Sequence, residues 1–82
     1  MDYTIPIGSS TLIKSGFLSS VSIFYSGMIS ENIFAISVQD VTRLGNAFVP
    51  LYFPIKTEEI TIRGISFSVK SVSPESITLV RK

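Results

Sequence analysis

The chain has 82 residues, a net charge of +1 and 45% hydrophobic residues, which is enough for one small domain. It has no cysteine, so neither disulfides nor thiolate metal sites can support a small core. It also has no histidine, the usual general base near neutral pH and the commonest metal ligand. Charged residues make up only 16%, against about 25% in typical domains. We therefore expect an unusually neutral surface, or one that a partner covers.

The N-terminal sequence MDYTIPIG has an acidic second residue and no basic segment, so we expect no secretory signal peptide. The longest charge-free stretch, Ser15–Ser30, contains six serines and two glycines. It falls short of the ~20 mostly apolar residues that a membrane-spanning helix needs. We expect no spanning segment, and the sequence does not indicate a compartment.

Alternating apolar residues predict short strands through the first half of the chain. Asp2–Ile7 alternates, and Pro6 within it is typical of an edge or opening strand because proline cannot donate to a neighbouring strand. Thr11–Lys14 begins a second segment, which Gly16 interrupts. Ile33–Val41 alternates clearly and is followed by a turn signal at Leu44-Gly45-Asn46.

The segment Leu18–Tyr25 admits two interpretations. Its serines disfavour a helix interior, and its β-branched and aromatic residues favour a strand. The apolar residues at 17, 21, 24 and 28 also fall at helical spacing, so a helix stays open as an alternative. We favour the strand, ending at a turn over Ser26-Gly27.

The C-terminal run Ile60–Lys82 is the best-specified part of the sequence. It contains three strand-like pieces: Ile60–Arg63, Ile65–Val72 and Ser76–Arg81. Between the last two pieces, Ser73-Pro74-Glu75-Ser76 is typical of a type I turn, which predicts a β-hairpin.

Together these segments predict a single all-β domain over residues 1–82, a small antiparallel barrel or sandwich of six to seven short strands. The alternation slips at Gly16 and Gly64, as it would at a bulge or sharp corner. Corners of this kind, and the need to remove edges from an apolar chain, favour the barrel over the sandwich.

The residues offer little for catalysis. Glu58 and Glu59 are the only adjacent carboxylates, and in a strand they would point to opposite faces. The adjacent pairs Lys14-Ser15 and Lys70-Ser71 are expected by chance in a serine-rich chain. We expect no enzymatic activity, no metal and no cofactor.

The most apolar run, Ala47–Ile55, predicts a surface for a partner. Pro50 and Pro54 exclude a central strand, which leaves an edge strand or a polyproline-like crossing. One face of a strand cannot bury every large side chain in this run, and exposed aromatic groups are typical of interfaces. The predicted interface residues are Phe48, Leu51, Tyr52 and Phe53. The competing interpretation is that a loop covers the run.

The leading functional hypothesis is a non-enzymatic protein-interaction or structural assembly module that self-associates. A small component of a virion or other large particle would fit this description. The alternative is a small β-barrel that binds single-stranded nucleic acid or DNA through its basic C-terminal third. The residues for that alternative are Lys56, Arg63, Lys70, Arg81 and Lys82, and with so few cations we expect weak, salt-dependent binding.

Overall fold

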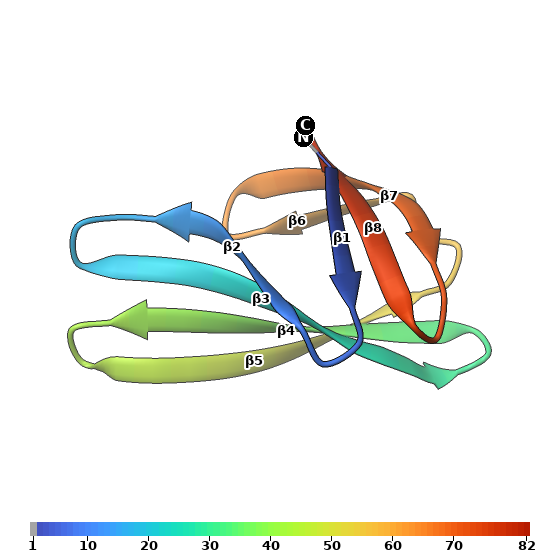
Figure 1. The fold of residues 1–82 in the computed structure, drawn as a ribbon, viewed down its shortest axis with the longest axis horizontal. Helices are drawn as coiled ribbons and strands as arrows, with labels where there is room; N and C mark the ends of the chain where they lie inside the picture. The colour runs from blue at the N-terminus through green and yellow to red at the C-terminus, as the bar shows by residue number, and fades with distance from the viewer. Residues whose placement is uncertain (1) are drawn as a thin grey trace.

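The structure is a computed structural model that describes residues 2–82. Eight strands run through these residues (Figure 1). They are β1 (Asp2–Pro6), β2 (Ser10–Ser15), β3 (Ser19–Ser30), β4 (Ile33–Thr42), β5 (Gly45–Pro54), β6 (Glu59–Ile62), β7 (Ile65–Val72) and β8 (Ser76–Arg81). Every observed strand pairing is antiparallel, and the predicted all-β class is confirmed.

The strands form two four-stranded sheets with the orders β1-β8-β7-β6 and β2-β3-β4-β5. The sheets do not close into a barrel, and the arrangement is consistent with a sandwich. The expected preference for a barrel is therefore wrong, and so is the count of six to seven strands. β1 and β5 are both edge strands, as their prolines predicted.

The two glycines that suggested barrel corners lie instead in tight hairpin turns. Gly64 has a φ of 81°, and Arg63 before it has a φ of 51°. Because Ile62 pairs directly with Ile65, Arg63 and Gly64 form the whole turn between β6 and β7. Gly16 lies in the turn between β2 and β3, where its N–H donates to the Ser19 carbonyl at 2.7 Å. In both places the alternation slips because the chain reverses direction.

Strand β3 is longer than the sequence predicted, and the helical alternative for this segment is wrong. The expected turn at Ser26-Gly27 is a register shift within the strand, between Tyr25 and Gly27. Gly27 has a φ of 91°, and a Cβ there would lie 2.6 Å from the Ile7 Cδ1. Only glycine suits this backbone, which lets the start of the chain cross β3 closely.

The core lies between the two sheets and draws on both. Its fully buried members include Phe67, Ile77 and Leu79 from one sheet and Ile23, Tyr25, Phe34, Ile36 and Val38 from the other. The Tyr25 side chain crosses the core, and its hydroxyl donates to the backbone carbonyl of Ser73 in the β7–β8 turn. This bond connects the longer sheet to the hairpin of β7 and β8. That hairpin confirms the one predicted from the C-terminal sequence.

The sheet β2-β3-β4-β5 extends well beyond the other sheet. The hairpins β2–β3 and β4–β5 project side by side to the left in Figure 1, and the molecule measures 38 × 24 × 18 Å. We call this projection, residues 15–20 and 41–48, the arm. All residues of β5 from Gly45 to Pro50 are exposed, whichever face they occupy. Strand pairing, rather than burial between sheets, therefore holds the arm together.

Candidate interaction surface

The four predicted interface residues lie on strand β5 but not on one face. Phe48 and Tyr52 point away from the other sheet, and each is 59% exposed. Leu51 and Phe53 point inward and pack partly buried against the core. The Phe53 ring stacks on that of Phe34, with centroids 5.4 Å apart. The structure thus brings Phe48 and Tyr52 together on an exposed face and assigns Leu51 and Phe53 to folding.

We call the exposed side of sheet β2-β3-β4-β5 the outer face. Residues paired directly across antiparallel strands share a face, so the register identifies its members. They include Leu12, Ser22, Phe24, Ala35, Ser37, Gln39, Val41, Phe48, Pro50 and Tyr52. None of these described residues carries a charge. The outer face is therefore a neutral surface of apolar, aromatic and small polar side chains.

An aromatic pair lies across the middle of the outer face. The rings of Phe24 on β3 and Phe48 on β5 have centroids 5.8 Å apart at an angle of 53°. They approach over β4, where the intervening side chains are Ser37 and Gln39. Phe24 was not among the predicted interface residues. It alternates in phase with Ser20 and Ser22, which could have indicated that its side chain points away from the core.

The free edge of β5 is poorly suited to pairing with another strand. Ile55 donates its N–H back toward β4, to the Asn32 carbonyl at 2.7 Å. Strand alternation then directs the even-numbered positions of β5 toward the free edge. Pro50 and Pro54 occupy two of these positions and have no N–H to donate. A partner is therefore better accommodated on the outer face than as an added strand.

The predicted nucleic-acid-binding residues are mostly engaged within the protein. Arg63 binds Asp40 through two hydrogen bonds, from Nε to Oδ1 at 3.1 Å and from Nη2 to Oδ2 at 2.6 Å. This guanidinium holds the pKa of the Asp40 carboxyl below its usual value, chiefly through the hydrogen bonds and also through its charge. The pair connects the β6–β7 turn to β4, and so joins the two sheets at the base of the arm.

Of the other four cations, two have partners within the protein and two are exposed. Lys82 forms an ion pair with Glu59 at 2.9 Å, and the Arg81 guanidinium donates to the Ile13 carbonyl at 3.2 Å. Lys70 is exposed on β7, and Lys56 is exposed between β5 and β6. Phe67, the aromatic residue nearest to this group in the sequence, is completely buried and is not available for stacking on bases.

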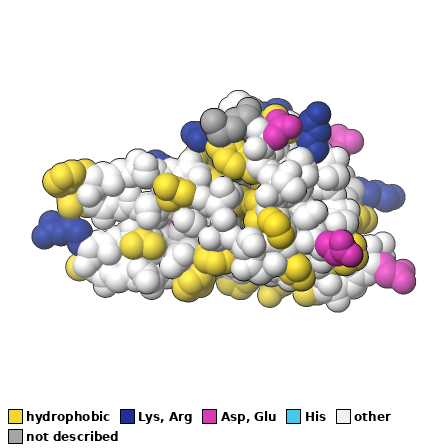
Figure 2. All heavy atoms as spheres, viewed as in Figure 1, with side chains coloured by type: hydrophobic (Ala, Val, Ile, Leu, Met, Phe, Trp, Pro, Cys, Tyr) yellow, Lys and Arg dark blue, Asp and Glu magenta, His cyan; other side chains and the backbone are white. Residues whose placement is uncertain are grey.

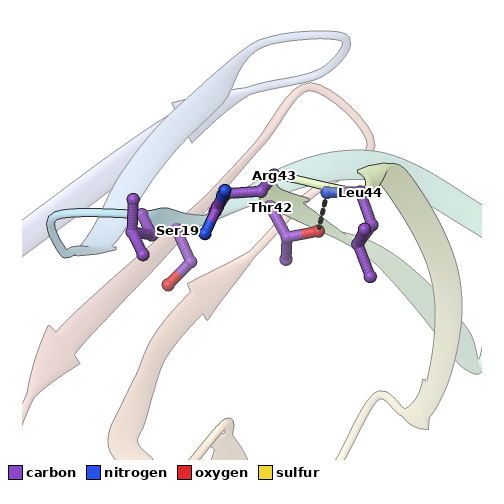
Figure 3. A pocket seen from close by; sticks show the side chains of 5 residues that line it. Ser19, Thr42, Arg43 and Leu44 are labelled. Carbon is purple, nitrogen blue, oxygen red and sulfur yellow. Dashed lines mark hydrogen bonds between the residues drawn. The ribbon is translucent and has the colours of Figure 1, made fainter.

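A second exposed apolar group, which sequence reasoning missed, lies at the end of the arm. Phe17 and Leu44 are each 99% exposed, and Leu18 is 52% exposed. Figure 3 shows the hollow beside them, which Leu18, Ser19, Thr42, Arg43 and Leu44 line. There the Leu44 N–H donates to the Thr42 hydroxyl at 3.2 Å, which orders the turn between β4 and β5. The sequence did contain a signal for this group, because Leu44 is an apolar residue inside the predicted turn Leu44-Gly45-Asn46.

Across residues 2–82, no three acidic side chains gather closely enough to hold a metal ion. Over the same residues, no helix is long and apolar enough to cross a membrane. No protein-family model, curated protein or solved structure matches the chain.

Proposed function

We propose that this protein is a non-enzymatic assembly module that associates with further copies of itself through the outer face. The observation that carries the proposal is the exposure of Phe48 and Tyr52, at 59% each, on a sheet face without charge. Phe24 and Leu12 extend the same surface toward the opposite edge of the sheet. A small building block of a virion or another large particle is the class of role we propose.

The neutrality of the outer face supports self-association in particular. A patch with an excess of one sign of charge repels its own copy in a symmetric contact, so a self-associating patch should be neutral or internally balanced. The outer face meets this condition because its members are apolar residues, serines and one glutamine. Tyrosine and phenylalanine are also enriched in interface cores, where charged residues are depleted.

The size of the apolar contribution is adequate for a reversible contact. A fully buried side chain of this kind contributes about 1.5–3 kcal/mol, and a symmetric pair counts each residue twice. More than half of the surface of Phe48 and of Tyr52 is exposed, so most of this contribution is still available to a partner. Loss of rotational and translational freedom offsets much of the sum, so we expect association in the micromolar range rather than tighter.

Support for the nucleic-acid alternative is weaker. Three of the five basic residues have partners within the protein, namely Arg63, Arg81 and Lys82. Phe67, one of the aromatic residues that such binding would use for stacking on bases, is buried.

The experiment that tests the proposal compares Tyr52→Glu with Thr61→Glu. Both substitutions put one carboxylate on an exposed strand position, but Thr61 lies on β6 in the other sheet. Both variants therefore have the same net charge. We expect Tyr52→Glu to lower the average mass measured by sedimentation equilibrium, whereas Thr61→Glu keeps the wild-type mass. Circular dichroism checks that both variants retain the β spectrum.

Two results would reject the outer-face contact. A Tyr52→Glu variant that stays folded with the wild-type mass means that this residue lies outside any self-contact. A Tyr52→Glu variant that unfolds means that the side chain supports the fold. Tyr52→Ser, which removes the ring without adding charge, then separates loss of packing from the introduced carboxylate.

A further inference from the structure

The end of the arm combines apolar exposure with positive charge. We call Phe17, Leu18, Arg43 and Leu44 the tip. Phe17 and Leu44 are 99% exposed, and no acidic residue occurs in either turn that forms the tip. Figure 2 shows hydrophobic side chains and a basic one together at the left end of the molecule. Water-exposed phenylalanine and leucine in adjacent turns contribute nothing to the core, so folding does not account for their presence.

The opposite end of the molecule also exposes apolar side chains, but its charge is acidic. We call Ile7, Ile29, Glu31 and Glu75 the acidic end. Ile7 is 53% exposed and Ile29 is 60% exposed. The Ile7 N–H donates to the Glu75 carbonyl at 2.7 Å, and Ile7 also packs beside Gly27 of β3. Glu31 lies in the β3–β4 turn, at the other end of β3 from the tip.

One cation lies near the acidic end. Lys56 follows Ile55, whose N–H donates to the Asn32 carbonyl beside Glu31. Two carboxylates and this one ammonium leave the acidic end net negative, and Figure 2 shows acidic side chains at the right of the molecule. The tip and the acidic end lie at opposite ends of a molecule 38 Å long, so they cannot meet within one copy.

We infer that the tip of one copy docks on the acidic end of the next copy. Phe17 and Leu44 would pack against Ile7 and Ile29, and Arg43 would pair with Glu31 or Glu75. The two surfaces match in both apolar character and charge, which favours a second copy as the occupant. A tip-to-tip contact would instead place two Arg43 guanidinium groups against each other.

Because each copy has one tip and one acidic end, the contact is heterologous and repeats. Such contacts generate a ring when the rotation between copies closes, and a filament when it does not. This inference deepens the proposed self-association by adding a second, independent surface. The outer face would then connect copies sideways, while the tip and the acidic end connect them lengthwise.

The test uses Tyr52→Glu as its background, so that outer-face association is removed first. The tip-blocked variant adds Phe17→Asp and Leu44→Asp, and the acidic-end-blocked variant adds Glu31→Lys and Glu75→Lys. A control variant adds Asp2→Lys and Glu58→Lys, which changes the net charge by the same amount as the acidic-end-blocked variant but at residues outside both surfaces. Masses are measured by sedimentation equilibrium for each variant alone and for an equimolar mixture of the two blocked variants.

We expect the background and control variants to form species larger than a dimer as concentration rises. Each blocked variant alone should remain a 9.0 kDa monomer, because one of its two surfaces is disabled. The mixture should form a heterodimer and grow no further, since only one compatible tip and acidic end remain for each pair. We expect blocking to weaken association at least about tenfold, the effect of losing one large apolar contact.

Several outcomes would overturn the inference. Assembly by the acidic-end-blocked variant alone would indicate a tip-to-tip contact, and a mixture that stays monomeric would exclude docking. A background variant that stays monomeric at high concentration would also exclude it. Binding of the wild type to phosphatidylserine-containing vesicles, lost on Phe17→Asp, would assign the tip to a membrane surface instead. The proposed function is tested separately, because it depends only on how the wild type and Tyr52→Glu differ.

Discussion

The two halves of the sheet β2-β3-β4-β5 use similar residues for different purposes. In the half beneath the other sheet, Ile23, Ile36 and Val38 are 0–1% exposed. In the arm, Leu18 and Phe48 are more than half exposed, although they belong to the same hairpins. The change occurs within strand β5: every residue up to Pro50 is exposed, and from Leu51 onward partly buried and exposed residues alternate.

This difference separates the residues that fold the protein from those that are available to a partner. A strand that extends beyond its opposing sheet loses the apolar burial that stabilises a sandwich. The arm keeps only its hydrogen-bonded ladder and cross-strand contacts, which are worth much less than burial. Its phenylalanines and leucines are therefore the natural residues to examine for binding.

The largest expected effect is the difference in free energy of unfolding between a substitution in the core and one in the arm. Leu79→Ala in the core should lower the free energy of unfolding by about 2–5 kcal/mol, because a fully buried side chain leaves a cavity. Leu44→Ala in the arm should change it by no more than about 0.5 kcal/mol, because that side chain is 99% exposed. Urea unfolding measures both. Equal losses would contradict the division between folding and binding residues.

Tyr25→Phe should have the next largest effect on stability. It removes the hydroxyl that donates to the Ser73 carbonyl and leaves that carbonyl without this bond, at a cost of about 1–3 kcal/mol. Phe24→Tyr is the converse control on the same strand, since its added hydroxyl would lie on the outer face and stability should change little.

The pH dependence of Tyr25 gives a further measurement on the same pair of proteins. Burial raises the pKa of the Tyr25 phenol above its usual value. Its stabilising contribution should be complete below the unfolded pKa of about 10 and should decrease as the pH rises above it. The decrease should be smaller in Tyr25→Phe. An identical alkaline loss in both proteins would mean that Tyr25 does not titrate with unfolding.

Pro50→Thr tests whether the prolines protect the free edge of β5. The substitution supplies an N–H at a position directed away from β4 while keeping strand propensity. We expect little change in stability but faster, concentration-dependent aggregation, followed by light scattering and thioflavin fluorescence. Ser37→Thr, on the neighbouring inner strand, is the control that should not aggregate. Unchanged solubility of Pro50→Thr would show that another feature blocks the edge.

The smallest expected effect concerns the ion pair at the base of the arm. Because Arg63 lowers the pKa of Asp40, this carboxylate stabilises the fold above its unfolded pKa of about 3.9, and the contribution disappears as the pH falls. The wild type should therefore lose slightly more stability than Asp40→Asn between neutral pH and about pH 3. High salt should reduce the difference, because both side chains are partly exposed.

Much of the fold could be predicted from local patterns. Alternation indicated strands in most regions where they occur, and Ser73-Pro74 identified the turn between β7 and β8. The segment that forms β5 was left open between an edge strand and a polyproline-like crossing. The choice between barrel and sandwich depended on which distant strands pair, such as β1 with β8, and no local pattern specifies that pairing. The β3 bulge was missed because Ser26-Gly27 has the same composition as a turn, while the crossing of Ile7 that requires glycine is non-local.

The candidate surface was predictable only in part, for a related reason. The alternation of β5 puts Phe48 and Tyr52 in one phase and Leu51 and Phe53 in the other, although the prediction grouped all four residues in one interface. It could not indicate which phase faces the core, because that depends on the position of the opposing sheet. The tip was not predicted because Phe17 and Leu44 lie in separate turns, and only the pairing of β3 with β4 brings these turns together.

Whether the outer face holds copies of this protein together can be read from the average mass in solution. The average mass of the wild type and of Tyr52→Glu is measured by sedimentation equilibrium over a thousandfold range of concentration around the micromolar association expected of such a contact. We expect the wild-type mass to rise from the 9.0 kDa of a monomer as concentration increases, and Tyr52→Glu, still folded, to assemble less at every concentration. A wild type that stays at the monomer mass throughout, or a variant that follows the wild-type curve, would contradict this expectation.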